Sequence, residues 1–169
     1  MRTKLRAANI PRPQWPQSLH WDWGRKGLQL TLQQTPGDIR VMGIRRQTVW
    51  EAAMVTISGP HNSLSPPDAG SPLVYTDYLE VAPWNWPVKE IGQTRRFKAV
   101  GPTLLAFAIA QSEAKGWLGR AGLHALPQAT KFYTDHGFAF VKNDPDKQNL
   151  PYYELTATEA QKQKKKERR

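Results

Sequence analysis

A short basic stretch at residues 95–101 has the composition of an anion-binding turn. It reads Arg-Arg-Phe-Lys-Ala-Val-Gly and leads into an apolar pattern of helical period. The first backbone N–H groups of a helix have no partner within it, so they attract phosphate groups. The side chains of Arg95, Arg96 and Lys98 would add charge-assisted hydrogen bonds. The stretch therefore predicts a site for a phosphate-bearing ligand. The alternative is a basic connector between a strand and a helix.

The sequence gives no comparable support for metal, thiol or Ser/His/Asp chemistry. Cys is absent, which excludes disulfides, thiol catalysis and Cys-ligated metals. The four His residues are scattered, and none stands beside Asp or Glu at a spacing typical of metal ligands. His136, beside Gly137, is typical of a charge at a helix C-terminus. We therefore expect no metal, and no nucleophile-elbow motif supports Ser/His/Asp catalysis.

The charge of the chain is concentrated at its C-terminal end. The formal net charge is +10, and residues 162–169 hold six Lys or Arg and one Glu, a net +5, which leaves +5 for the remainder. This balance favours anionic partners such as nucleic acid, an anionic cofactor or an acidic protein surface. It disfavours a polycationic substrate. For the tail, the alternative is a solvated segment that only keeps the protein soluble.

The length of 169 residues suits one domain with a sizeable core. No apolar run is long enough to span a membrane, and the N-terminus lacks the apolar stretch of a secretory signal, so we expect a soluble cytoplasmic protein. Residues 1–27 form an arm rich in Trp and Pro, residues 28–156 the domain and residues 157–169 a basic tail. The indoles of the arm either pack on the domain or offer a stacking surface.

Alternation of apolar and polar residues predicts a series of strands. We expect them at residues 28–32, 39–44, 48–58, 73–81, 121–125, 138–141 and 151–155. Residues 48–58 also fit a helical stripe, but their β-branched end favours a strand. Residues 59–71 are rich in Pro, Gly and Ser and predict a polar, mobile loop.

Helices are expected between these strands. The pattern at residues 102–115 is helical, with Gly101 as the cap, Pro102 at the first position and Gly116 at the stop. A second helix is expected from residue 127 or 128 to Gly137, and a short one at residues 18–23. Thr156 and Glu159 form a capping box that begins a helix in the basic tail. The sum is a mostly antiparallel α+β domain.

Three segments in this order resemble the GCN5-related N-acetyltransferase (GNAT) family, over roughly residues 73–155. Leu-Glu-Val-Ala-Pro at residues 79–83 is similar to the family's strand ending in L-x-V-x-P. Residues 96–101 are similar to its Q/R-x-x-G-x-G/A loop. Ala-Thr-Lys-Phe-Tyr at residues 129–133, with Gly137 and Phe138, is similar to its A-x-x-[LF]-Y-x-x-x-G-F helix. The resemblance implies the GNAT fold, acetyl-CoA as donor and transfer of an acetyl group to an amine.

The sequence departs from the family pattern at three places. Ala99 stands where the loop has its first glycine, which is tolerable if the φ angle there is negative. Leu126 replaces the usual Asn, so the hydrogen bond to the pantetheine arm is either missing or supplied by Gln128. Residues 33–38 are too few for the two helices that follow the family's first strand. Either residues 1–27 replace those helices or the acceptor side is open to a large partner.

The resemblance also implies roles for individual residues. Tyr133 matches the family's general acid, which protonates the departing thiolate; the alternative is a core tyrosine. A backbone N–H of the strand at residues 80–82 would bond the thioester carbonyl. The residues expected to bind the cofactor are Val81, Arg95, Arg96, Phe97, Lys98, Ala99, Val100, Gly101, Pro102, Thr103 and Gln128.

An amine acceptor must lose a proton, and three residues are candidates for the base: Asp77, Glu80 and His124. Asp77 and Glu80 point to opposite faces of their strand, so at most one of them acts directly. His124 ends its strand near the point where the family's central strands separate around the acetyl group. For each of the three, the alternative is a polar side chain with a purely structural role.

Two functions from different classes remain open at this point. The first is an acetyl-CoA-dependent N-acetyltransferase whose acceptor is macromolecular, either an aminoacyl-tRNA or a protein. The second is a non-catalytic module of the same fold that binds nucleic acid or a protein through residues 162–169 and the Trp-rich arm. The loop at residues 84–94 is either a flap over the acceptor or a packed surface segment.

Overall fold

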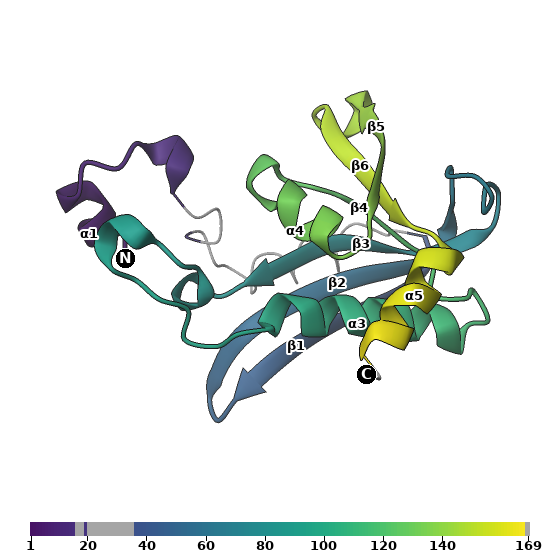
Figure 1. Cartoon of the computed structure of the whole chain (residues 1–169), viewed down its shortest axis with the longest axis horizontal. Coiled ribbons are helices and arrows are strands. Elements are labelled where there is room, and N and C mark those ends of the chain that lie inside the picture. The colour runs from purple at the N-terminus through teal and green to yellow at the C-terminus, as the bar shows by residue number, and fades with distance from the viewer. Residues whose placement is uncertain (16–18, 20–35, 168–169) are drawn as a thin grey trace. The chain divides into compact units, whose positions relative to one another are not determined.

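The computed structural model describes residues 1–15, 19 and 36–167 (Figure 1). The strand expected at residues 28–32 lies outside the described residues. So does the short helix expected at residues 18–23, apart from Leu19. The described part begins with helix α1 (Arg2–Ala7) and a single 3-10 turn at Arg12–Gln14.

Among the described residues, six strands form one mixed sheet in the order β1-β2-β3-β4-β6-β5. Their bounds are β1 Asp38–Arg46, β2 Val49–Asn62, β3 Pro72–Val81, β4 Ala121–His124, β5 Ala139–Asp144 and β6 Leu150–Leu155. Strands β3 and β4 are parallel, whereas β6 is antiparallel to both β4 and β5. The ambiguous stretch at residues 48–58 is a strand. The predicted α+β architecture is confirmed.

Strand β2 is longer than predicted, and the loop after it is correspondingly shorter. Residues 59–62 belong to the strand, and the hairpin closes where Ser63 N–H donates to the Ser71 carbonyl at 2.8 Å. The ring of His61 stacks on Tyr75 of β3 with 4.3 Å between centroids. This cross-strand contact stabilises a pairing that the Pro and Gly of the segment argue against.

Helix α3 (Val100–Ala114) begins two residues before the predicted start. Its first bond joins Thr103 N–H to the Ala99 carbonyl at 3.0 Å. Gly101 is therefore a helical residue and not the cap. Pro102 lies in the first turn, where its missing N–H costs no hydrogen bond. Gly116 ends the helix with a φ of +75°, as predicted.

The two later helices are confirmed. A 3-10 turn at Pro127–Ala129 leads into helix α4 (Thr130–Asp135), after which Gly137 has a φ of +78°. Helix α5 (Ala157–Glu167) begins in the basic tail, where Thr156 Oγ1 accepts a hydrogen bond from Glu159 N–H at 3.3 Å. The tail is thus helical up to residue 167.

The chain divides into two compact units. The first consists of Met1–Thr35, Met42–Met54 and Leu79–Leu104, and the second of Pro36–Val41, Val55–Tyr78 and Leu105–Arg169. Strands β1, β2 and β3 and helix α3 each pass from one unit to the other. In the second unit, Gln111 of α3 bonds two buried hydroxyls of β2, those of Thr56 at 2.7 Å and Ser58 at 2.9 Å.

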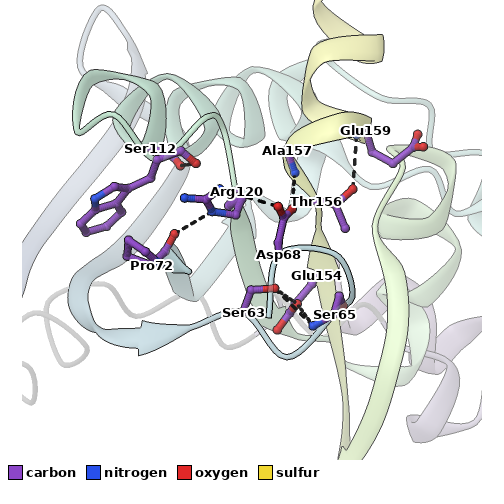
Figure 2. A network of polar contacts seen from close by, with 11 residues as sticks. Ser63, Ser65, Asp68, Pro72, Ser112, Arg120, Glu154, Thr156, Ala157 and Glu159 are labelled. Carbon is purple, nitrogen blue, oxygen red and sulfur yellow. Dashed lines mark hydrogen bonds and ion pairs between the residues drawn. The ribbon is translucent and has the colours of Figure 1, made fainter. Parts of the chain in front are cut away.

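A buried polar network fixes the loop at residues 63–71, which we expected to be mobile (Figure 2). Glu154 of β6, 1% exposed, accepts hydrogen bonds from Ser63 Oγ at 2.7 Å, Leu64 N–H at 2.8 Å and Ser65 N–H at 3.0 Å. Three bonds to one buried carboxylate hold the start of the loop on the sheet.

The other end of the loop is tied to helix α5. Asp68 accepts a hydrogen bond from Ala157 N–H at 2.7 Å, which satisfies a free donor of the helix start (Figure 2). The same carboxylate pairs with Arg120 at 3.7 Å, and Arg120 Nε donates to the Pro72 carbonyl at 3.0 Å. The network therefore joins the loop, the chain before β4 and the first turn of α5.

Candidate functional site

The predicted phosphate-binding stretch lies in the first unit and ends in the first turn of α3. Ala99 has a φ of +59°, so the condition under which Ala would be tolerated without strain is not met. This is the left-handed region, which glycine adopts freely but where the Cβ of Ala has a steric cost. The chain nevertheless turns into helix α3 at this residue.

Two backbone N–H groups of this stretch are already used within the protein. Arg96 N–H donates to the Trp84 carbonyl and Phe97 N–H to Asn85 Oδ1, each at 3.1 Å. These two donors therefore do not face an incoming phosphate. The helix start that follows them supplies donors that have no intrahelical acceptor. An anion site in this unit would therefore rest on residues 98–101.

Cations surround the ring of Phe97. The guanidinium carbons of Arg46 and Arg96 lie 5.0 and 5.3 Å from its centroid, within the range of cation–π attraction. Arg95, Arg96 and Lys98 are all exposed. The stretch thus combines a helix start with accessible positive charge, as the sequence predicts. Arg46, from the end of β1, is a further cation beside this stretch that the sequence did not predict.

Glu51 is the buried residue of this unit that the sequence analysis missed. It lies in β2, 2% exposed, and accepts a hydrogen bond from Trp84 Nε1 at 2.6 Å and another from Asn85 Nδ2 at 3.0 Å. Its one signal in the sequence is a charge at a position where the strand alternation calls for an apolar side chain. The loop at residues 84–86 is held by this carboxylate.

Side chains from separate strands meet in the second unit at the end of β4. Strands β3 and β4 pair as far as Thr76 and Leu123, and His124 is the last residue of β4. His124 Nδ1 lies 2.8 Å from the Tyr75 hydroxyl, and its Nε2 lies 3.0 Å from Asp144 Oδ2. All contacts are satisfied when Nε2–H donates to Asp144 and Nδ1 accepts from Tyr75. The result is a Tyr–His–Asp array.

The array is lined by further aromatic and charged groups. Tyr152 packs against His124 with 4.9 Å between ring centroids, and its hydroxyl occupies the space that a Cβ at residue 122 would need. Gly122 therefore permits the aromatic packing. The ammonium of Lys147 lies 6.0 Å from the centre of the Tyr75 ring.

Burial shifts the pKa values of the array. Desolvation lowers the pKa of His124, partly opposed by the bond to Asp144, and also lowers that of His61. Desolvation raises the pKa of Asp77, opposed by the charges of Lys147, His61 and His124. It also raises the pKa of Tyr75. The imidazoles are therefore neutral near pH 7, and Asp77 is a stronger base than an exposed carboxylate.

Tyr133 is buried in the second unit and packs against aromatic rings. The centroid of its ring lies 5.1 Å from that of Phe132 and 5.9 Å from that of Phe138. Burial raises the pKa of Tyr133 to about 12. Its phenol therefore stays protonated at neutral pH, as a general acid must before it donates.

Two of the three base candidates, His124 and Asp77, lie in the second unit and interact through their charges. Glu80 and Val81 belong to the part of β3 in the first unit, and Gln128 lies in the 3-10 turn before α4. His136, predicted to act at a helix end, bonds the Phe132 carbonyl through Nδ1 at 2.6 Å. Sequence reasoning missed Tyr75 and Asp144 as partners of His124, and His61 as the ring that stacks on Tyr75.

No protein-family model and no curated protein sequence matches the chain. Among solved structures, a putative GNAT-family acetyltransferase from Desulfovibrio desulfuricans matches with a TM-score of 0.52 at 13% identity, over 92% of this chain and 91% of that one. FeeM, an N-acyl amino acid synthase from uncultured soil microbes, matches with a TM-score of 0.53 at 12% identity, over 79% and 77%.

A third match is the PaiA N-acetyltransferase from Thermoplasma acidophilum in complex with coenzyme A. The TM-score is 0.49 at 18% identity, over 70% of this chain and 61% of that one, so the match spans less than two thirds of that protein. The matches with TM-scores above 0.5 show that the chain has the fold of the GNAT acetyltransferases. The fold implied by the three motifs is therefore confirmed.

Two further findings concern only the described residues. No helix there combines the length and the apolar character needed to cross a membrane. No group of three or more His, Cys, Asp or Glu side chains is arranged there to hold a metal ion.

Proposed function

We propose that the protein is an N-acetyltransferase that uses acetyl-CoA as its donor. The observation that carries the proposal is the Tyr75–His124–Asp144 array, which stands in a GNAT fold where β4 ends beside the continuing strand β3. An array of this kind can take up a proton, and an amine must lose one to become a nucleophile. The fold likeness and the basic helix start support acetyl-CoA as the source of the acetyl group.

In the first unit, the helix start at residues 98–101 would bind the pyrophosphate of coenzyme A. Backbone N–H groups and the helix dipole favour an anion there. Arg95, Arg96 and Lys98 would add charge-assisted contacts. The N–H groups of residues 96 and 97 take no part, because they bond the loop at residues 84–85.

In the second unit, Asp77 and His124 would accept the proton of the acceptor amine. Both ring nitrogens of His124 are bonded, so a proton would reach Nδ1 through the Tyr75 hydroxyl, while Asp144 stabilises the imidazolium. Asp77 can accept a proton directly. As the N–C bond forms, the C–S bond breaks, and Tyr133 would give its proton to the thiolate. Positioning of the two substrates would provide most of the acceleration.

The acceptor is proposed to be macromolecular, either an aminoacyl-tRNA or a protein. The support is the net charge of +10, because a basic surface attracts anionic macromolecules over long distances. An α-amine with an ordinary pKa of about 8 needs less help to lose a proton than a lysine at about 10.4. A base of moderate strength such as Asp77 or His124 suits the former better.

Calorimetric titration with acetyl-CoA tests the donor. Saturable binding well below millimolar concentration is the expected result, and an absence of binding at millimolar concentration would contradict the proposal. Incubation with labelled acetyl-CoA and cell extract, followed by identification of the labelled product, then tests the acceptor. Label in tRNA or protein supports the macromolecular acceptor, whereas label confined to small amines contradicts it.

A further inference from the structure

The loop at residues 83–86 connects a buried carboxylate of β2 to the phosphate-binding stretch, within the first unit. On one side, Glu51 binds Trp84 and Asn85 through its carboxylate, and its carbonyl accepts from Ala82 N–H at 2.8 Å and from Asn85 Nδ2 at 3.1 Å. Among the described residues, the polar contacts of the Glu51 carboxylate are with Trp84 and Asn85 of the loop and with Arg96 of the stretch that follows it.

On its other side, the loop holds the stretch itself. The Trp84 carbonyl accepts from Arg96 N–H, and Asn85 Oδ1 accepts from Phe97 N–H. The amide of Asn85 therefore has only one orientation that satisfies its partners, with Nδ2 toward Glu51 and Oδ1 toward Phe97. Asn85 is 4% exposed, so water does not replace these bonds at low cost.

The charge of Glu51 acts on Arg96. Glu51 Oε1 has no hydrogen-bond partner among the described residues, and Arg96 Nη1 lies 3.8 Å away as an ion pair. The Arg96 side chain is 50% exposed and also lies against the Phe97 ring. Glu51 and Phe97 thus limit where the guanidinium can go, while half of its surface stays open to an anion.

We propose that Glu51, Trp84 and Asn85 form a brace that shapes the phosphate-binding stretch at residues 95–101 and aims Arg96 at the phosphates of the donor. The brace turns the N–H groups of residues 96 and 97 inward and leaves the helix start as the anion site. In this proposal the loop at residues 84–86 supports donor binding and does not act as a flap over the acceptor. Glu51 is a positioning residue, since it reaches the donor only through Arg96 and Asn85. The inference rests on the proposed function.

Three variants test the brace. Glu51→Gln keeps the size of the side chain but removes the charge that pairs with Arg96 and one acceptor oxygen. Trp84→Phe removes only the indole N–H. Asn85→Ala leaves Phe97 N–H without its acceptor. Glu90→Gln makes the same chemical change as Glu51→Gln at an exposed position of the same unit and serves as the control.

Acetyl-CoA binding and backbone hydrogen exchange are measured on the whole protein. We expect the brace variants to bind acetyl-CoA about tenfold to a hundredfold more weakly, the loss typical of one hydrogen bond to a charged group. Amide exchange should accelerate at residues 96 and 97 and stay unchanged at Leu104 and Leu105. Glu90→Gln should match the wild type in both measurements.

Three results would overturn the inference. Unchanged acetyl-CoA affinity in all three variants removes the positioning role while leaving the proposed function intact. If amide exchange in the brace variants accelerates equally throughout the first unit, Glu51, Trp84 and Asn85 contribute only to stability. If Glu51→Gln fails to fold, Trp84→Phe and Asn85→Ala decide the outcome. A wild type that binds no acetyl-CoA contradicts the proposed function first, and the inference with it.

Discussion

Nε2 of His124 lies 3.0 Å from the carboxylate oxygen Oδ2 of Asp144, and this contact leaves Nδ1 to accept the hydrogen bond of Tyr75. The two residues come from different strands, and 20 positions of the chain separate them. The carboxylate fixes the tautomer of the imidazole and favours its protonated form, which opposes the effect of burial on its pKa.

Asp144→Asn should lower the pKa of His124 further, because the variant removes the negative charge and leaves the desolvation. We expect the acid limb of the rate profile to move to lower pH by about one unit, with a slower rate at its plateau. Titration of the imidazole by NMR measures the same shift without substrate. Asp146→Asn, an exposed neighbour, is the control, and a limb that moves to higher pH would contradict the assignment.

The lowered pKa of His124 also predicts how stability depends on pH. Between the folded pKa and about 6.5, the unfolded chain binds more protons at this residue than the folded protein does. The contribution of neutral His124 to the free energy of unfolding is therefore fully present above about pH 6.5 and is lost as the pH falls below that value. Urea denaturation between pH 5 and 7, compared with His124→Gln, checks the sign. A wild type that gains stability on acidification relative to the variant would contradict it.

Tyr133→Phe should depress turnover about a hundredfold or more, the usual range for loss of a general acid. Affinity for acetyl-CoA should stay the same, because the hydroxyl acts on the departing thiolate. Rapid measurement of transfer and calorimetry of donor binding separate the two effects. Tyr153→Phe, at a similarly buried position of β6, is the control. Unchanged turnover in Tyr133→Phe would assign Tyr133 to the core.

Ala99→Gly should stabilise the protein by about 0.5 to 1 kcal/mol, since the steric cost of a left-handed alanine exceeds the entropy that glycine loses on folding. Ala110→Gly, at an exposed helical position of α3, should destabilise by a similar amount. Thermal and urea unfolding measure both. If both variants change the free energy of unfolding in the same direction, the backbone at residue 99 is not strained.

Glu154→Gln should cost about 1 to 3 kcal/mol near neutral pH, because an amide cannot accept all the bonds that reach the carboxylate. Burial alone would raise the pKa of Glu154, but the donors of Leu64, Ser63 and Ser65 outweigh it and lower the pKa. This stability is therefore present above about pH 4.5 and is lost at lower pH. Glu90→Gln is again the control, and an equal loss in both variants would contradict the role of the network.

The basic tail stays a predicted contact for nucleic acid. Lys162 pairs with Glu159 at 2.5 Å and Lys164 with Glu113 at 2.8 Å, so part of its charge is balanced within the protein. Deletion of residues 162–169 should weaken binding to tRNA and flatten its salt dependence. Filter binding across a range of salt concentrations measures both, and an unchanged slope would leave the tail as a solvated segment.

Elements whose signals are local could be predicted from the sequence. The motifs at residues 79–83, 96–101 and 129–138 are each short and continuous in the chain, and their resemblance to the family's motifs implied the GNAT fold. The helix stops at Gly116 and Gly137 and the cap at Thr156 could likewise be predicted from nearby residues. Each depends on neighbouring backbone conformation or on a short period of apolar residues, and both are visible in the printed order of residues.

Which distant groups meet depends on the tertiary structure and could not be predicted from the sequence. Glu51 gains its partners 33 and 34 positions away in the loop at residues 84–85, and Glu154 fixes a loop 89 to 91 positions before it. The base candidate His124 acquires Tyr75 and Asp144 because parallel and antiparallel pairing bring β3, β4 and β5 into one sheet. A buried charge is stable only where partners converge on it, and that convergence depends on strand order and register.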